Sequence, residues 1–233
     1  MVEASFNQMQ VNRAIDLGFA DGVRALMRQD PDVVMIGEIR DLETAEMAIQ
    51  AALTGHLVLS TLHTNDAPSA ITRMLDLGVP AYLINSTLLG VMAQRLVRTL
   101  CPHCKKAVQP REDQRAAWRS LVAPWKSAEP TQIWLPVGCL ECRMTGYTGR
   151  VGIYEILVNS PEIRRQIKPL TEIPKLREQA FREGMRPLRI SGALKVAQGI
   201  TSLEEVIKVA PPSDESIECG IDLMTQNSYQ IPR

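Results

Sequence analysis

The sequence predicts an α/β protein with a parallel sheet and flanking helices. Two short apolar runs, Val33–Ile36 and residues 57–62, have the composition of strands that are buried on both faces. Residues 44–53 between them are apolar at helical spacing, and Gly55 follows where a glycine commonly ends a helix. Strand, helix and strand in this order form a βαβ unit, whose crossover is right-handed in almost all proteins.

The composition favours a globular protein of the cytoplasm. The chain has 233 residues, enough for a large core, and its 26 basic residues balance its 26 acidic ones. Neutral charge and 4% aromatic residues argue against a nucleic-acid-binding surface. No apolar run reaches the roughly 18 residues of a membrane span, and the N-terminus lacks the pattern of a signal peptide.

Polar residues follow both predicted strands. Glu38 and Arg40 come just after the first strand, and His63 follows the second. Because ligands of open α/β sheets bind outside the carboxyl ends of the strands, these side chains are expected to share one crevice. A carboxylate for Mg²⁺ or its water, a polar group near the γ-phosphate and a cation would suit nucleotide hydrolysis. Glutamate and histidine at strand ends are also common without any catalytic role.

A helix is predicted upstream, over residues 16–28. Its Arg24 and Arg28 are one turn apart and share a face, which could equally be a solvated basic surface. The helix is expected to stop at Asp30, because the residue before Pro31 is pushed out of the α region.

Further helices are predicted after the second strand. One begins at Asp66, and residues 80–98 are expected to continue as helix with basic residues at their end. A strand ends near Val158. A closing helical bundle follows, with Thr201 and Glu204 resembling a capping box. The helices of this bundle are predicted at residues 160–167, 173–183, 188–198 and 202–209.

Four of the five cysteines form two C-x-x-C pairs. Cys101 and Cys104 make the first pair, and Cys139 and Cys142 make the second. Two such turns, each supplying two thiolates, are typical of a tetrahedral zinc site rather than of disulfides. His103 lies inside the first turn and is expected to be a bystander. The insert between the pairs is expected to form a small exposed subdomain shaped by the metal.

These features divide the chain into four predicted parts. Residues 1–100 form part of the sheet-containing core, and residues 101–142 form the four-cysteine subdomain. Residues 143–209 complete the core and form the helical bundle. Residues 210–233, with the odd Cys219, have no sustained period and are expected to be a weakly ordered tail.

Several segments resemble one family, the hexameric secretion ATPases that drive type II secretion and type IV pilus assembly. The segment DPDVVMIGEIRD resembles that family's Walker B region, and TGHLVLSTLHTND resembles its His box. The resemblance extends, in order, over residues 8–209 and includes QVNRAIDLGFADGVRALMRQ, CPHC with CLEC, GRVGIYEIL and EGMRPLRISGALKVAQGITSLEEVI. The cysteine insert points to the assembly branch rather than the retraction branch.

The resemblance implies a RecA-like P-loop NTPase core that cycles ATP with Mg²⁺ at the subunit interfaces of a hexameric ring. Glu38 matches the Walker B glutamate near Mg²⁺. His56 and His63 bracket the His box, and His63 is better placed to sense the γ-phosphate. Arg24, Arg28 and Arg40 match arginines of the family that steady phosphates or neighbouring subunits. The family's zinc ligands are matched by Cys101, Cys104, Cys139 and Cys142. The implied partners are secretion or pilus platform proteins at the inner membrane, with no nucleic acid.

The sequence departs from the family in one important respect. No G-x-x-x-x-G-K-[ST] phosphate loop occurs in it. The chain is therefore expected to be the C-terminal half of such a motor, and ATP turnover is expected from the complete protein but not from this chain alone. Two alternatives remain at this point: a non-catalytic, zinc-dependent oligomerisation or docking module, and a zinc ribbon that binds nucleic acid, which the neutral charge disfavours.

Overall fold

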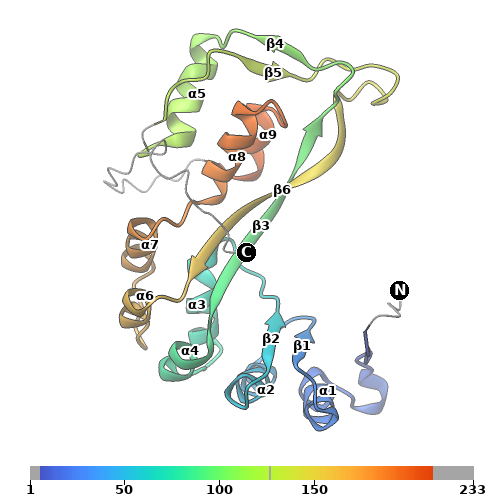
Figure 1. Ribbon diagram of the computed structural model, residues 1–233, viewed down its shortest axis with the longest axis vertical. Coiled ribbons are helices and arrows are strands. Elements are labelled where there is room, and N and C mark those ends of the chain that lie inside the picture. The colour runs from blue at the N-terminus through green and yellow to red at the C-terminus, as the bar shows by residue number, and fades with distance from the viewer. Residues whose placement is uncertain (1–5, 126, 212–233) are drawn as a thin grey trace. The chain divides into compact units, whose positions relative to one another are not determined.

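The structure is a computed structural model that describes residues 6–125 and 127–211 (Figure 1), and it divides into two compact units. The first contains the described residues up to Leu89 together with Asn159–Ile173. The second contains Gly90–Val158 and the described residues from Pro174 onward. Nearly all of the predicted tail, including Cys219, lies outside the described residues.

The first unit contains the predicted βαβ arrangement. Strands β1 and β2 are parallel, with Val33 opposite Leu57 and Ile36 opposite Ser60, which confirms the predicted pairing. The side chain of Asp41 accepts a hydrogen bond from the backbone N–H of Thr44 and caps α2. The elements of this unit are η1 (Arg13–Ile15), α1 (Phe19–Leu26), η2 (Met27–Gln29), β1 (Val33–Ile36), α2 (Leu42–Leu53), β2 (Leu57–Ser60), α3 (Ala67–Asp76), α4 (Ala81–Thr87) and α6 (Pro161–Gln166).

Only one face of this two-stranded sheet is covered in the described part of the chain. Val34 and Ile36 are buried, and α1 packs beside β1 while α2 packs beside β2 (Figure 1). The alternate residue Met35 is 73% exposed, and Val33 is also exposed. The prediction that the strand is buried on both faces is therefore wrong for these residues, because successive strand residues point to opposite faces and the helices cover one of them.

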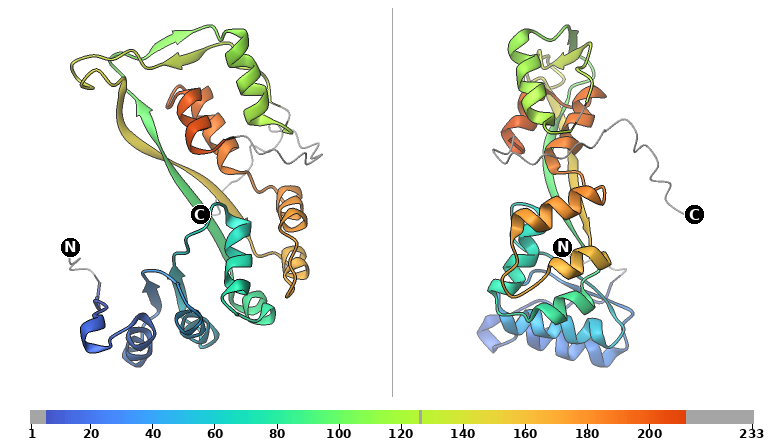
Figure 2. Two further views of the ribbon diagram at one scale, coloured as in Figure 1. Left: turned by 180° about the vertical axis from the view of Figure 1, so that it is seen from behind. Right: turned by 90° about the vertical axis from the view of Figure 1, so that its left-hand side faces the viewer.

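The second unit is built on a long antiparallel pair of strands. β3 (Gly90–Leu100) pairs with β6 (Tyr147–Val158), and Gly90 lies opposite Val158. The two strands form a twisted ribbon (Figure 2), and α8 packs against both of them. The other elements are β4 (Lys106–Val108), α5 (Glu112–Val122), β5 (Ile133–Leu135), α7 (Ile173–Arg182), which begins at the boundary of the units, α8 (Leu188–Ala197) and α9 (Leu203–Val209).

The prediction of a continuous helix over residues 80–98 is wrong. A helix forms only over α4, Ala81–Thr87, and the chain then enters β3. Buried Ala93 and Val97 face inward at helix-like spacing, so their positions fit either structure. The strand is decided by its hydrogen-bonded partner β6, a segment distant in the sequence.

The insert between the cysteine pairs is less exposed than the sequence suggests. Trp118 and Leu121 of α5 are buried, and α5 packs against α8. Trp125 meets the ring of Phe181 edge-on, with 4.8 Å between the ring centroids. The expectation of an exposed subdomain is wrong in this respect, since the insert shares a core with the C-terminal helices.

The four predicted C-terminal helices are present as α6, α7, α8 and α9. Helix α9 begins one residue later than the predicted capping box implies: Ser202 is the N-cap, and its hydroxyl accepts a hydrogen bond from the backbone N–H of Glu205. The hydroxyl of Thr201 instead donates to the carbonyl oxygen of Arg98 at 2.8 Å. Among the described residues, no helix combines the length and apolar character that crossing a membrane requires.

Candidate functional site

The carboxyl ends of β1 and β2 form the candidate site in the first unit. The parallel register brings the loops after both strands to one edge of the sheet. The backbone N–H of Ile39 donates to the carbonyl oxygen of Thr61 at 3.0 Å. The Thr61 hydroxyl donates in return to the carbonyl oxygen of Gly37 at 2.7 Å. These two bonds fix the segment around Glu38 against the segment leading to His63.

Glu38 lies between two nitrogen-bearing side chains. Its Oε1 atom is 2.7 Å from a guanidinium nitrogen of Arg40, and its Oε2 atom is 3.1 Å from Nε2 of His63. The side chain of Glu38 is 19% exposed, whereas that of His63 is 84% exposed. The structure thus brings together the three residues predicted as catalytic, with the carboxylate innermost.

This arrangement favours the ionised form of the carboxyl group. The hydrogen bond from Arg40 lowers the pKa of Glu38, and the bond with His63 adds to this effect, while partial burial opposes both. A carboxylate held ionised at a strand end can bind a hydrated divalent cation or orient a water molecule. The exposed imidazole and guanidinium can hydrogen-bond to an anionic ligand at the same edge.

The other predicted nucleotide contacts lie on different elements. Arg24, on α1, is 2.8 Å from Asp21 and 3.8 Å from Glu43 of α2. Arg28 is exposed in η2. His56 precedes β2, at the end of the strand away from His63, and its Nδ1 atom is 2.8 Å from the carbonyl oxygen of Ala51. These contacts of Arg24 and His56 are with residues other than Glu38, Arg40 and His63, and the assignment of all three residues to nucleotide binding stays a prediction.

The second unit brings the four predicted metal ligands together. The sulfur atoms of Cys101, Cys104, Cys139 and Cys142 all lie within 4.8 Å of one another. The Sγ atoms are 3.9 Å apart between Cys101 and Cys139, 3.8 Å between Cys104 and Cys142, and 3.7 Å between Cys139 and Cys142. Four sulfurs placed about 2.3 Å from one zinc ion in a tetrahedron are separated by about 3.8 Å. The cluster therefore fits a zinc ion.

Backbone donors surround these sulfurs. The N–H groups of Cys139 and Gly146 each donate to Sγ of Cys142 at 3.2 Å, and that of Gly138 donates to Sγ of Cys104 at 3.3 Å. Burial raises the pKa of Cys142, but the N–H donors of Cys139 and Gly146, together with contacts to the thiols of Cys139 and Cys104, outweigh it and lower this pKa to about 6. Burial raises the pKa of Cys104 to about 11. The cluster thus already stabilises thiolate charge at Cys142, which is the form that binds metal. The side chain of His103 is exposed, in keeping with its predicted bystander role.

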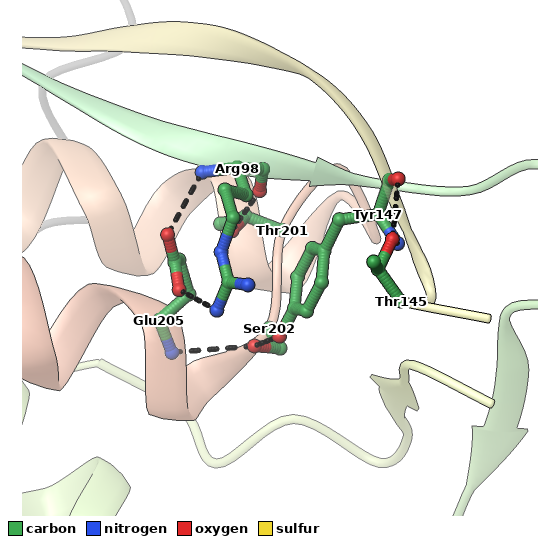
Figure 3. Close-up of polar contacts among 6 residues, drawn as sticks. All are labelled: Arg98, Thr145, Tyr147, Thr201, Ser202 and Glu205. Atoms are coloured by element: carbon green, nitrogen blue, oxygen red, sulfur yellow. Dashed lines mark hydrogen bonds and ion pairs between the residues drawn. The ribbon is translucent and has the colours of Figure 1, made fainter. Parts of the chain in front are cut away.

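The sequence did not predict a partly buried polar cluster in the same unit. Glu205 of α9 accepts hydrogen bonds from the backbone N–H of Arg98 at 3.1 Å and from its guanidinium at 2.6 Å (Figure 3). The guanidinium lies 4.1 Å from the centre of the Tyr147 ring. No sequence motif marks Arg98 and Glu205, which are distant in the chain. Their pairing becomes visible only when α9 is docked on β3.

The fold and the site geometry define the class of this protein. It is an α/β protein with an acidic site at the ends of two strands and a four-cysteine centre. A family model described as "Type II/IV secretion system protein" matches residues 2–208, and the chain belongs to this family. This confirms the resemblance drawn from the Walker B, His-box and cysteine segments.

Characterised relatives agree with this assignment. The chain is 59% identical over 211 residues to the "Type IV pilus assembly ATPase TfpB" of Acinetobacter baylyi, covering 91% of this chain and 36% of the relative. It is 51% identical over 202 residues to the "Type II secretion system protein E" of Aeromonas hydrophila, covering 87% of this chain and 39% of the relative. The chain thus spans less than half the length of these relatives.

Solved structures agree as well. The chain is similar to the pilus retraction motor PilT with bound ADP, with a TM-score of 0.55 and 29% identity over 83% of this chain and 44% of that one. The Legionella pneumophila ATPase DotB gives a TM-score of 0.55 at 25% identity, over 82% of this chain and 42% of that one.

Proposed function

We propose that this chain supplies the carboxylate side of the ATP site and the zinc centre of a motor ATPase that powers type II secretion or type IV pilus assembly. The observation that carries the proposal is the clustering of Glu38, Arg40 and His63 at one sheet edge, in a chain whose relatives include proteins named as a type IV pilus assembly ATPase and a type II secretion system ATPase. In this proposal, Glu38 orients water and the hydration shell of Mg²⁺, and His63 senses the γ-phosphate of ATP. Arg40 neutralises charge that develops on the phosphates.

The phosphate-holding side of the site is proposed to come from outside this sequence. A P-loop binds phosphates through backbone N–H groups and a lysine, and the sequence contains no G-x-x-x-x-G-K-[ST]. The uncovered apolar face of β1 and β2 supports the same proposal, because it offers a surface on which further polypeptide of the sheet domain could pack. Arg24, Arg28 and His56 remain candidates for contacts with phosphates or with a neighbouring subunit.

The wider setting proposed for the complete protein follows from the family. It is a hexameric ring in the cytoplasm, held at the inner membrane by platform proteins of the secretion or pilus machinery. In this proposal, the complete protein converts ATP binding and hydrolysis into movement of that machinery.

A chimera tests this function. When this chain replaces the matching segment of the Acinetobacter baylyi pilus ATPase, the purified chimera should hydrolyse ATP in the presence of Mg²⁺, whereas the 233-residue chain alone should show no turnover. Glu38→Gln in the chimera should lower turnover by about 100-fold or more, because the neutral amide cannot serve as a base or hold the hydrated cation in the same way.

The matched control is Glu46→Gln, which changes an exposed glutamate on α2 and should leave the turnover of the chimera unchanged. Equal loss from both substitutions, or full activity of the Glu38 variant, would contradict the assignment of Glu38. Turnover by the isolated chain would contradict the need for an external phosphate loop.

A second candidate function is a non-catalytic docking module organised by zinc. The absent phosphate loop and the preformed four-cysteine cluster favour it. Co-purification of this chain with full-length relatives or with their platform proteins would then survive Glu38→Gln and fail after Cys101→Ser. Retention of every partner by the Cys101 variant would count against this function.

A further inference from the structure

The loop before α9, residues 199–202, is held on one side by the first cysteine turn. The ammonium of Lys105 donates a hydrogen bond to the carbonyl oxygen of Gly199 at 2.8 Å and lies 4.6 Å from the centre of the Trp134 ring. Lys105 follows Cys104 directly, and its backbone N–H donates to the carbonyl oxygen of Cys101 at 3.0 Å. One end of this loop is therefore attached to the turn that presents two metal ligands.

The strands next to the metal ligands hold the rest of the loop. The N–H of Leu100, the residue before Cys101, donates to the carbonyl oxygen of Ile200 at 2.8 Å. The hydroxyl of Tyr147 is 2.7 Å from that of Ser202 (Figure 3). Tyr147 follows Gly146, which donates to Sγ of Cys142 through its N–H and accepts from the N–H of Cys101 through its carbonyl oxygen.

Helix α9 begins directly after these contacts. Ser202 caps its first turn, and the buried Glu205 in that turn forms an ion pair with Arg98, whose side chain is half exposed. Glu205 is only 6% exposed, so its charge depends on this partner being in place. The start of α9 is thus held by neighbours in sequence of Cys101 and Cys104, and by Tyr147, which follows the Gly146 that donates to Cys142.

We propose that zinc binding at the four cysteines is energetically coupled to the docking of α9 on β3, through the 199–202 loop. Groups hydrogen-bonded around a metal site commonly orient its ligands, and metal binding commonly contributes to the folding of its surroundings. Without the metal, the two cysteine turns lose their common ligand, and Lys105 and Gly146 lose the fixed positions from which the loop is held. This inference goes beyond ATP hydrolysis and does not depend on it.

Hydrogen exchange on the 233-residue chain tests the coupling. Removing zinc with a chelator should accelerate exchange of the α9 amides by at least about tenfold, while the amides of α2 in the first unit keep their rates. Restoring zinc should restore the slow exchange. Unchanged exchange in α9, or equal acceleration in α2 and α9, would overturn the proposal, since the latter indicates global unfolding.

Two lysine variants separate this coupling from a general effect of the metal. Lys105→Met keeps an apolar stem beside Trp134 and removes the donor to Gly199, so α9 of the zinc-loaded variant should exchange several-fold faster and respond less to chelation. The control, Lys106→Met, changes the neighbouring exposed lysine of β4 and should behave as the unmodified chain. Identical exchange in both variants would overturn the role of Lys105.

Coupling between two sites is reciprocal, which provides a test from the other end. Glu205→Gln removes the charge that pairs with Arg98 and should loosen α9. Competition with a zinc-binding dye should then show weaker zinc binding, by about three- to tenfold. An unchanged zinc affinity in a variant with faster α9 exchange would contradict the coupling.

Discussion

At the scale of single residues, the candidate site depends on how the charge of Glu38 is held. Arg40 and His63 occupy separate oxygens of its carboxylate, and both contacts favour the ionised form. The pKa of Glu38 therefore lies below its ordinary value of 4.5. Because the pKa of Glu38 is lower in the folded state, its ionisation stabilises the fold at a pH above the pKa of the unfolded state. This contribution is lost as the pH falls through the pKa of the folded state.

Substitution of Arg40 tests this electrostatic arrangement. Arg40→Gln should raise the pKa of Glu38 toward 4.5, because the largest favourable contact of its carboxylate is lost. A titration of the Glu38 carboxyl carbon by NMR measures the shift directly. Arg24→Gln, which removes a partner of Asp21, should leave the Glu38 titration unchanged. An unmoved midpoint in the Arg40 variant would show that this contact does not hold the charge.

At the scale of elements, the two C-terminal helices of the second unit approach closely. Gly192 lies on α8 where an added methyl group would overlap Cγ1 of Val206 on α9, and Val206 is fully buried. Alanine is favoured over glycine within a helix by about 1 kcal/mol, so an open site would be stabilised by the substitution. At Gly192 the overlap with Val206 is expected to outweigh this gain, so the substitution should destabilise the protein.

Gly192→Ala should therefore lower the free energy of unfolding by about 1–3 kcal/mol, as measured in urea. Val206→Ala alone should also destabilise, by about 2 kcal/mol, through the cavity it leaves. The double variant should be more stable than the sum of the two effects by at least about 1 kcal/mol, because the smaller side chain makes room for the new methyl group. Strict additivity would show that the two helices do not touch at this point.

At the scale of the whole molecule, the first unit has an apolar sheet face that no other part of the described residues 6–125 and 127–211 covers. Val33, Met35, Leu57 and Leu59 are all exposed on the parallel strands β1 and β2. Contiguous apolar surface of this kind promotes association. The relatives are longer than this chain, and an exposed sheet face beside the Glu38 cluster agrees with the proposal that further polypeptide packs there.

The double variant Met35→Thr with Leu59→Thr should reduce self-association of the isolated chain, because threonine keeps a high strand propensity while making the face polar. Light scattering at increasing protein concentration measures the change. Leu170→Thr, at a leucine that is exposed outside this sheet, is the control and should have little effect. In the chimera with the pilus ATPase, the same double variant should instead be destabilising if the face is covered there.

The sequence by itself determined the features that depend on neighbours along the chain. Helical spacing and Gly55 predicted α2, the apolar runs predicted β1 and β2, and the C-x-x-C pairs predicted four cysteines in one cluster. Each of these signals is local, since helix caps, turns and ligand pairs lie within a few residues of one another. The parallel pairing followed from the order of elements, and it placed Glu38 and His63 at one edge.

Only the tertiary structure decided the features that depend on distant partners. Residues 90–98 form a strand because β6 pairs with them, and Ser202 caps α9 while the hydroxyl of Thr201 donates to the carbonyl oxygen of Arg98 on β3. The ion pair of Arg98 with Glu205 and the burial of the cysteine insert against α8 arise in the same way. The physical reason is that such contacts join segments whose local patterns fit more than one structure, and long-range packing selects among them.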